Sequence, residues 1–165
     1  ADERITKSLK IEIEEVIISN THDAYKLNFP HFYMNRFLYY HDDNVTRLVK
    51  RNNCKFKGSV HEKLIVNGTV GQLKNPVLHF TYKGFIPYVT KKDSYAWFQA
   101  QQLFDKGKKA TYFHLIFKPI YRFFSSYFLR GGIFDGIPGL TVASVNAYGV
   151  FSRYAKLMLL QRGIR

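Results

Sequence analysis

The sequence has few residues that could cross-link the chain through disulfide bonds or bound metal ions. Its single cysteine, Cys54, excludes an internal disulfide framework and a Cys-based zinc finger. It contains no His-Glu-x-x-His or Cys-x-x-Cys motif, no Gly-Lys-Ser/Thr phosphate loop and no serine in a nucleophile elbow. These absences argue against zinc-peptidase, P-loop and α/β-hydrolase chemistry.

Long apolar runs are also scarce. The longest charge-free stretch beyond Phe104, Gly136 to Ser152, has 17 residues and contains Pro138, Asn146 and three glycines. A membrane-spanning helix needs about 20 predominantly apolar residues. The pattern therefore argues against a spanning helix and leaves an interfacial helix possible.

Acidic residues are few, with 12 Asp+Glu against 25 Lys+Arg, so the chain carries a formal charge of +13. This excess indicates an anionic partner, such as nucleic acid, a phosphate-bearing ligand or an acidic membrane surface. Hydrophobic residues make up 46% of the 165 residues, which is enough for a buried core and argues against general disorder. The length suits one domain or part of a larger one.

The chain changes character along its length. It begins Ala1-Asp2-Glu3-Arg4 without a methionine, and we expect an upstream half to be missing. Thr6 is a suitable N-cap for a short helix, which we expect to give way to a strand before residue 18. Residues 31–92 are typical of short strands and loops, with a turn at 41–44. Asp93 or Ser94 is expected to cap a helix that runs to about Asp105.

The region beyond Phe104 is basic and aromatic. It holds ten Lys/Arg against two acids, and 12 of the 28 aromatic residues. Between 112 and 124, basic side chains alternate with bulky apolar ones. Such a region suits either an interfacial membrane helix or aromatic packing on a neighbouring domain, and both interpretations stay open.

Several single residues have the right chemistry for a site, each with a plainer alternative. Asp2 could bind a divalent cation or be a solvated surface acid. The His61-Glu62 pair could supply a ligand and a general base, or lie on the surface. His79 lies in an apolar strand, where a hydrogen-bonded core histidine is the more common situation.

Two more groups are open to two interpretations. Arg47 and Arg51 could bind a phosphate through their guanidinium forks, or form a solvated basic strand face. Asp135 is an isolated acid in Phe134-Asp135-Gly136, where capping of the next helix is a strong alternative to a functional role.

The order of the motifs carries more information than any one of them. The series consists of Ala1-Asp2-Glu3-Arg4, Thr46 to Arg51, Gly58-Ser59-Val60-His61-Glu62, Gly71-x-Leu73 with Leu78 to Tyr82, Lys92-x-x-Tyr95-Ala96, and Gly132-Ile133-Phe134-Asp135-Gly136-x-x-Gly139. It resembles the family-2 inverting glycosyltransferases, in particular the bacterial branch close to the lipopolysaccharide-core beta-1,4-glucosyltransferases. The resemblance covers nearly the whole chain but only the second half of such an enzyme.

The resemblance implies an α/β fold: the C-terminal half of a GT-A (Rossmann-like) domain, followed by amphipathic C-terminal helices. Residues 1–92 would be the acceptor-side, catalytic half, with the nucleotide-binding half absent, and 93–165 a basic, aromatic, membrane-associating helical region. Ala1-Asp2-Glu3 looks like the end of an Asp-Ala-Asp-Glu motif, so Asp2 would bind a divalent metal, Mg²⁺ or Mn²⁺, with His79 near it.

The remaining roles follow from the same resemblance. Glu62 would be the catalytic base, with His61 as its orienter or the second choice. Arg47 and Arg51 would contact the donor diphosphate. Four residues would lie on the membrane or acceptor side: Lys118, Arg122, Arg130 and Asp135. The sequence departs from the family in the compressed segment Phe29 to Asp43 and in Val49, where an aromatic residue is common.

The expected function is sugar transfer, with inversion, from a nucleotide-sugar donor to a saccharide or lipid-linked acceptor in bacterial envelope or lipopolysaccharide biosynthesis. The enzyme would be peripheral, on the cytoplasmic face of the inner membrane, and the fragment would be inactive alone. The alternative is a non-catalytic basic module that binds membranes or nucleic acid. Nucleic acid is the weaker partner, because no RNA-recognition or helix-turn-helix signature is present.

Overall fold

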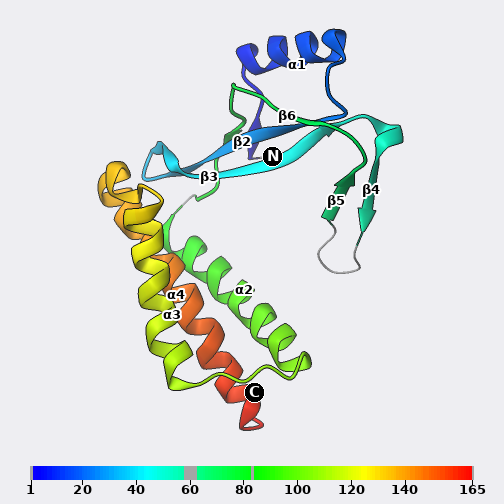
Figure 1. Ribbon diagram of the computed structural model, residues 1–165. Coiled ribbons are helices and arrows are strands. Elements are labelled where there is room, and N and C mark those ends of the chain that lie inside the picture. The colour runs from blue at the N-terminus through cyan, green and yellow to red at the C-terminus, as the bar shows by residue number, and fades with distance from the viewer. Residues whose placement is uncertain (1, 58–62, 83, 165) are drawn as a thin grey trace. The chain divides into compact units, whose positions relative to one another are not determined.

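The protein is described by a computed structural model covering residues 2–57, 63–82 and 84–164, with only the backbone of Tyr39 and His41 (Figure 1). It is a mixed α/β chain with a sheet and C-terminal helices. In chain order its elements are β1 (Glu3–Arg4), α1 (Lys7–Ser19), β2 (Ala24–Tyr33), β3 (Arg36–Val49), the 3-10 helix η1 (Arg51–Asn53), β4 (Cys54–Lys57), β5 (Lys63–Val66), β6 (Val70–Gln72), β7 (Leu78–His79), α2 (Phe85–Asp105), α3 (Tyr112–Phe124), the π-helical turn η2 (Ser125–Leu129), the 3-10 helix η3 (Gly132–Asp135) and α4 (Gly136–Gln161).

The chain forms two compact units. The first consists of residues 1–32 and 42–81 and contains most of the sheet. The second consists of residues 33–41 and 82–165 and contains the three long helices α2, α3 and α4. The β2–β3 hairpin contributes to both, since its tip belongs to the second unit. The boundary near residue 82 falls ten residues before the expected division at 92/93.

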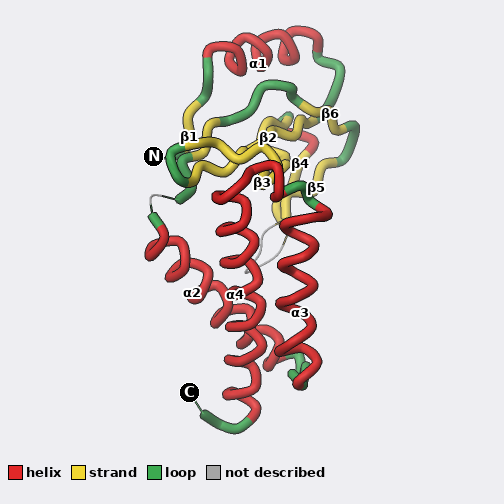
Figure 2. Tube along the Cα trace, turned by 90° about the vertical axis from the view of Figure 1, so that its left-hand side faces the viewer, coloured by secondary structure: helices red, strands yellow, loops and turns green. Residues whose placement is uncertain are grey.

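The first unit is built around strand β2. β3 lies along one edge of β2, whereas β6 and β7 pair with its other edge in parallel, β6 at Ala24 to Lys26 and β7 at His31. β1 pairs antiparallel with β7 and completes the five-stranded sheet. Figure 2 colours these strands in yellow. β4 and β5 form a separate two-stranded hairpin.

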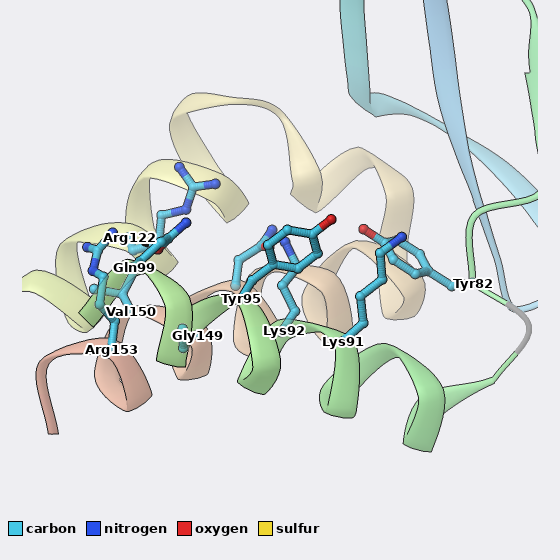
Figure 3. Close-up of a pocket in the computed structure, with 11 residues that line it drawn as sticks. Tyr82, Lys91, Lys92, Tyr95, Gln99, Arg122, Gly149, Val150 and Arg153 are labelled. Atoms are coloured by element: carbon cyan, nitrogen blue, oxygen red, sulfur yellow. Dashed lines mark hydrogen bonds between the residues drawn. The ribbon is translucent and has the colours of Figure 1, made fainter. Parts of the chain in front are cut away.

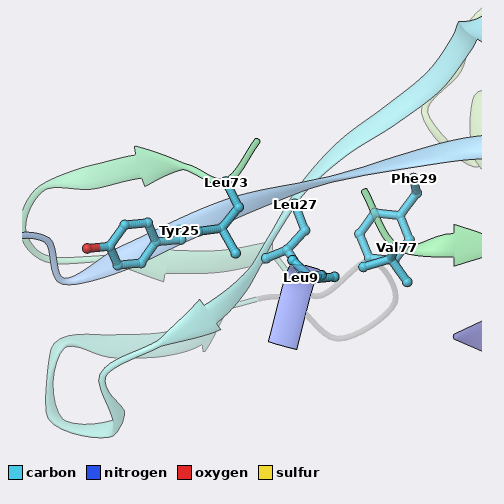
Figure 4. Close-up of a cluster of buried hydrophobic side chains, with 6 residues drawn as sticks. All are labelled: Leu9, Tyr25, Leu27, Phe29, Leu73 and Val77. Carbon is cyan, nitrogen blue, oxygen red and sulfur yellow. The ribbon is translucent and has the colours of Figure 1, made fainter. Parts of the chain in front are cut away.

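Helix α1 covers the sheet and supplies its central core residue. Thr6 is its N-cap, as expected, because the Thr6 hydroxyl accepts the Leu9 N–H at 3.1 Å. Leu9 has no exposed surface and packs among the buried side chains of Tyr25, Leu27, Phe29, Leu73 and Val77 (Figure 4). The strand expected before residue 18 was wrong: the helix continues to Ser19 and ends at Asn20 in the left-handed conformation.

The expected turn at residues 41–44 was also wrong, because β3 runs through it. The hairpin turns earlier, at Met34 and Asn35, both with positive φ, as a two-residue turn of this kind requires. The acids of 41–44 are partnered within the sheet: Asp42 accepts from the Asn28 amide at 2.6 Å, and Asp43 lies 3.0 Å from His31. These side-chain contacts hold polar residues in a strand position that the local sequence disfavours.

Glu12 fixes α1 to the loop before β7. Its carboxylate accepts hydrogen bonds from the backbone N–H groups of Lys74 and Asn75 and from the Asn75 side chain, at 2.7 to 2.8 Å. Burial raises the pKa of Glu12, but these hydrogen bonds outweigh burial and bring the pKa below its usual value. The charged carboxylate is therefore the form that stabilises this unit.

We expect Glu12→Ala to lower the free energy of unfolding by about 1–3 kcal/mol, because it leaves three donors without an acceptor. The loss should be greatest at neutral pH. Because the folded pKa lies below the unfolded one, the contribution is present above the unfolded value and disappears as the pH falls through the folded value. Urea unfolding at pH 7 and pH 3 measures this; Glu15→Ala, an exposed acid on the same helix, is the control. An equal loss at both pH values would contradict the prediction.

The second unit is a helical layer with α4 at its centre. Both α2 and α3 pack against α4, as Figures 1 and 2 show. One core cluster joins the hairpin tip to α2 and α4 and consists of Tyr33, Leu38, Tyr82, Tyr88, Val142 and Val145. The other joins α2 to α4 further along, through Ala100, Leu157 and Leu160.

Helix α2 begins at Phe85, eight residues before the expected cap at Asp93. Pro87 lies in its first turn, where a missing N–H costs nothing, so the proline is compatible with a helix start. Asp93 instead lies inside the helix and joins it to α4. Its carboxylate contacts Lys156 at 2.7 Å and accepts from Ser152 at 2.6 Å. Both contacts lower the pKa of Asp93, and the contact with Lys156 has the larger effect.

Gly139, the last residue of the Gly132-to-Gly139 motif, allows a close approach of η3 to α4. A Cβ at this position would overlap the carbonyl oxygen of Gly132, which is backbone. We expect Gly139→Ala to destabilise the helical unit by about 1–3 kcal/mol, since backbone must move to admit the methyl group.

The matched control lies on the same helix. A Cβ at Gly149 meets only Lys92 side-chain carbons, at 3.9 Å. Gly149→Ala should therefore raise stability by about 0.5–1 kcal/mol through helix propensity alone. Urea unfolding followed by helical circular dichroism compares the two variants, and similar midpoints for both would show that the approach at Gly139 can relax.

Candidate functional site

The first candidate site lies where β1 meets β7. Their antiparallel pairing places Glu3 opposite His79, and the Phe80 N–H donates to the Asp2 carbonyl at 2.8 Å. The Asp2 carboxylate then lies 3.4 Å from Nε2 of His79. A backbone hydrogen bond at Asp2 lowers the pKa of its carboxyl, and the neighbouring His79 lowers it further. The two residues predicted to be near the metal are thus brought together, with a charged carboxylate at neutral pH.

Phe29 connects this pair to Arg47. The buried Phe29 ring meets the His79 ring edge to face, at 6.3 Å between centroids, and the Arg47 guanidinium lies 6.0 Å from the same ring. His79 therefore has the Asp2 carboxylate beside it and shares the Phe29 ring with the Arg47 guanidinium. This set offers ligands for a divalent cation and a fork for a phosphate oxygen. Arg51 is exposed in η1.

A second His–Asp pair occurs in the same sheet and was not singled out from the sequence. His31 is the register partner of His79 on the adjacent strand, and its Nε2 lies 3.0 Å from Asp43. Only strand pairing brings these residues together, so no local motif marks them. Within the described residues, no cluster of three or more His, Cys, Asp or Glu side chains is arranged to hold a metal ion. A cation bound at Asp2 and His79 would need ligands from the substrate or from outside these residues.

The predicted base Glu62 and its neighbour His61 lie outside the described residues. In the sequence, Glu62 directly precedes β5, which pairs with β4 from Lys63 onward.

The four residues predicted for the membrane or acceptor side belong to the second unit. Lys118 on α3 and Arg130 after η2 are exposed. Asp135 is buried and makes contacts within the unit: it accepts the Tyr40 N–H at 3.4 Å through its carboxylate and an Arg36 N–H at 2.7 Å through its carbonyl. It thereby joins the hairpin tip to the start of α4.

Arg122 faces a cavity of about 540 Å³ among α2, α3 and α4 (Figure 3). Three more basic side chains line it, Lys91 and Lys92 from α2 and Arg153 from α4. Of the described residues that line the cavity, none is acidic. The sequence analysis named Lys92 only as part of a motif, without a role, and missed Lys91 and Arg153, because only the packing of the helices brings them to Arg122.

The exposed side of α3 is strongly apolar. Seven of its large apolar and aromatic side chains each have at least half of their surface accessible: Tyr112, Phe113, Ile116, Phe117, Ile120, Tyr121 and Phe124. We call this set the α3 apolar face. Among the described helices, none is both long and apolar enough to cross a bilayer.

Comparison with known proteins finds relatives that are named glycosyltransferases. The chain is 28% identical over 178 aligned residues to an uncharacterized glycosyltransferase of Rickettsia felis, and equally so to one of Rickettsia conorii, covering 95% of this chain and 61% of each relative. It is 28% identical over 119 residues to the lipopolysaccharide core biosynthesis glycosyltransferase LpsC of Rhizobium meliloti, covering 66% of this chain and 44% of LpsC. No family model and no solved structure matches.

The chain spans about three fifths of the length of its Rickettsia relatives. The resemblance to glycosyltransferases and to lipopolysaccharide core biosynthesis noted from the motifs is thus supported by the names of these relatives.

Proposed function

We propose that the protein containing this chain is an inverting glycosyltransferase of family 2, and that this chain is the C-terminal half of its GT-A domain with the helices that follow. It transfers a sugar from a nucleotide-sugar donor to a saccharide or lipid-linked acceptor in bacterial envelope or lipopolysaccharide biosynthesis. The relatives named glycosyltransferases support the reaction class. The observation that carries the site is the contact of Asp2 with His79, beside Phe29 and Arg47.

These residues suit a divalent cation. Asp2 offers a carboxylate oxygen, and the pKa of its carboxyl is lowered, while His79 offers the ring nitrogen Nε2. Mn²⁺ accepts both an oxygen and a nitrogen ligand, whereas Mg²⁺ prefers the carboxylate oxygen. A bound cation would neutralise charge on the leaving diphosphate. Arg47 would bind a diphosphate oxygen through its guanidinium, with Arg51 as a second basic contact.

The acceptor hydroxyl needs a base in the proposed reaction. Glu62 removes the hydroxyl proton as the oxygen attacks the anomeric carbon from the face opposite the diphosphate, with His61 orienting Glu62. The bond from the anomeric carbon to the diphosphate oxygen breaks with its electron pair, so a single displacement inverts the centre.

The α3 apolar face supports attachment to the cytoplasmic face of the inner membrane. Phe and Ile side chains can enter the boundary between headgroups and acyl chains, while Lys118 on the same helix meets anionic headgroups. Each basic residue close to such a surface contributes about 1 kcal/mol.

The test is an assay of the full-length protein with a panel of nucleotide-sugars, Mn²⁺ or Mg²⁺, and a lipid-linked saccharide acceptor. We expect release of a nucleoside diphosphate that depends on the acceptor, and a product with inverted anomeric configuration. No release over the panel, together with salt-sensitive binding to any oligonucleotide or to vesicles alone, would favour the non-catalytic basic module.

A further inference from the structure

The cavity lined by Arg122 has the size and shape of a ligand site. Its volume of about 540 Å³ lies within the range of small-molecule pockets, about 300–1,000 Å³. Three helices form its walls, so their packing fixes its side chains. We call it the basic pocket: Lys91, Lys92, Arg122 and Arg153 provide the charge, and its remaining lining residues are Tyr82, Tyr95, Ala96, Gln99, Asn146, Gly149 and Val150 (Figure 3).

The charged side chains of the basic pocket are all positive and repel one another. Burial lowers the pKa of the Arg122 guanidinium, and the neighbouring Arg130 and Arg153 lower it further, whereas Tyr88 acts in the opposite direction. Arg122 therefore lies where the fold disfavours its charge. In addition, the buried Nε of Arg153 has no hydrogen-bond partner among the described residues. Clustered cations with an unused buried donor are the arrangement that an anion would relieve.

The neutral lining residues are suited to an oxyanion. The Gln99 carbonyl oxygen accepts from Arg153 at 3.2 Å, which leaves the Gln99 amide nitrogen as a donor. The Asn146 carbonyl oxygen similarly faces the Tyr88 hydroxyl at 3.5 Å, and its amide nitrogen remains a donor. The pocket thus combines guanidinium forks, ammonium groups and amide N–H donors. A phosphate ligand can satisfy more of these donors than a carboxylate ligand can, because a phosphate has more acceptor oxygens.

Arg122 lies on α3, the helix that also carries the α3 apolar face, but on the opposite side of that helix. At about 100° per residue, the α3 apolar face is centred about 180° from Arg122. The phosphate of a lipid and the phosphate of a water-soluble molecule both fit the chemistry of the pocket, and vesicles of different composition distinguish these two sources.

We propose that the basic pocket binds a phosphate group of the acceptor. The identity of this ligand as the acceptor rests on the proposed function, whereas phosphate binding at the pocket does not. The helical unit then selects the acceptor, and the Asp2–His79 site in the first unit serves the donor.

The test measures phosphate binding separately from sugar transfer. Inorganic pyrophosphate is titrated calorimetrically, without a divalent cation and at fixed ionic strength, into the full-length protein carrying Arg47→Gln and Arg51→Gln, so that the proposed donor site does not bind it. This protein is the unaltered reference for the pocket variants. The double variant Arg122→Gln/Arg153→Gln should bind about tenfold more weakly or worse, because two charged hydrogen-bonding partners are lost. The exposed rim variant Lys91→Gln should weaken binding by a smaller factor, and it keeps the test valid if the double variant does not fold. Lys106→Gln/Arg162→Gln removes the same charge from exposed positions outside the pocket and should bind as the unaltered protein does.

The source of the phosphate is tested with vesicles. Phosphatidylcholine vesicles carry either phosphatidic acid, a phosphate monoester lipid, or phosphatidylglycerol, whose phosphate is a diester. We expect preferential sedimentation with phosphatidic acid, and loss of this preference in the double variant but not in the control.

Equal pyrophosphate affinity in the unaltered protein and both pocket variants would overturn the proposal. Pyrophosphate binding through the pocket without any preference for phosphatidic acid would assign the pocket to a water-soluble phosphate. A protein that binds phosphatidic acid through the pocket yet releases no nucleoside diphosphate from any donor would contradict the proposed function and leave the pocket assignment standing.

Discussion

Asp2→Asn in the full-length protein is expected to reduce sugar transfer by about 100-fold or more. The carboxylate lies 3.4 Å from His79, and its pKa is lowered by its backbone hydrogen bond and by His79, so it is charged throughout the neutral range. An amide keeps the shape but removes the charge that would hold a divalent cation against the leaving diphosphate. A higher Mn²⁺ concentration should then be needed for half-maximal rate, which a metal titration of initial rates measures.

The sheet offers a matched control for this variant. Asp43→Asn alters the other His–Asp pair, on the neighbouring strands of the same unit. It should leave the Mn²⁺ dependence unchanged. Identical metal titrations for Asp2→Asn and the unaltered protein would show that Asp2 does not bind the cation, and a shift in the Asp43 variant alone would move the site to His31.

Glu62→Gln is expected to lower kcat by about 10²–10⁴-fold, the range that general-base catalysis contributes. A glutamine side chain cannot take the proton from the hydroxyl group of the acceptor. The substitution otherwise removes only one charge from the site. Donor affinity, measured by calorimetry with the nucleotide-sugar, should therefore stay within about twofold of the unaltered protein. The exposed acid Glu15 on α1 provides the control variant Glu15→Gln, with full activity expected.

The same experiment separates the two candidates for the base. His61→Ala should retain more activity than Glu62→Gln if His61 only orients the base. Full turnover in Glu62→Gln together with loss in His61→Ala would transfer the role to the histidine. Loss of donor binding in Glu62→Gln would instead indicate that this residue belongs to the donor site.

Local signals predicted the elements whose ends depend on nearby residues. The Thr6 cap and the end of α2 at Asp105 were confirmed, because a capping hydroxyl and a Lys-Gly-Lys-Lys segment act over a few residues. The predicted start of α2 and the predicted turn within β3 were both wrong, and for the same reason. Contacts distant in sequence decide them: Asp93 joins α4, and Asp42 and Asp43 are held by Asn28 and His31. Tertiary partners here override the turn and cap preferences of aspartate.

The candidate sites divide in the same way. Asp2 and His79 were grouped through the resemblance, and the pairing of β1 with β7 brings them together. Of the basic pocket, the sequence analysis singled out only Arg122 as a site residue. Lys91 and Arg153 stand 31 residues before and after it, and no periodicity in one helix connects residues on three helices.

The central place of α4 has a consequence for how the protein is made. Both core clusters of the second unit draw on α4, through Val142 and Val145 in one and Leu157 and Leu160 in the other. Because α2 and α3 precede α4 in the chain, they leave the ribosome before the helix that buries them exists. During that interval the apolar side chains that later pack against α4 stay exposed to chaperones or to a nearby membrane. The helical unit therefore completes its fold only when the last of its long helices has been synthesised.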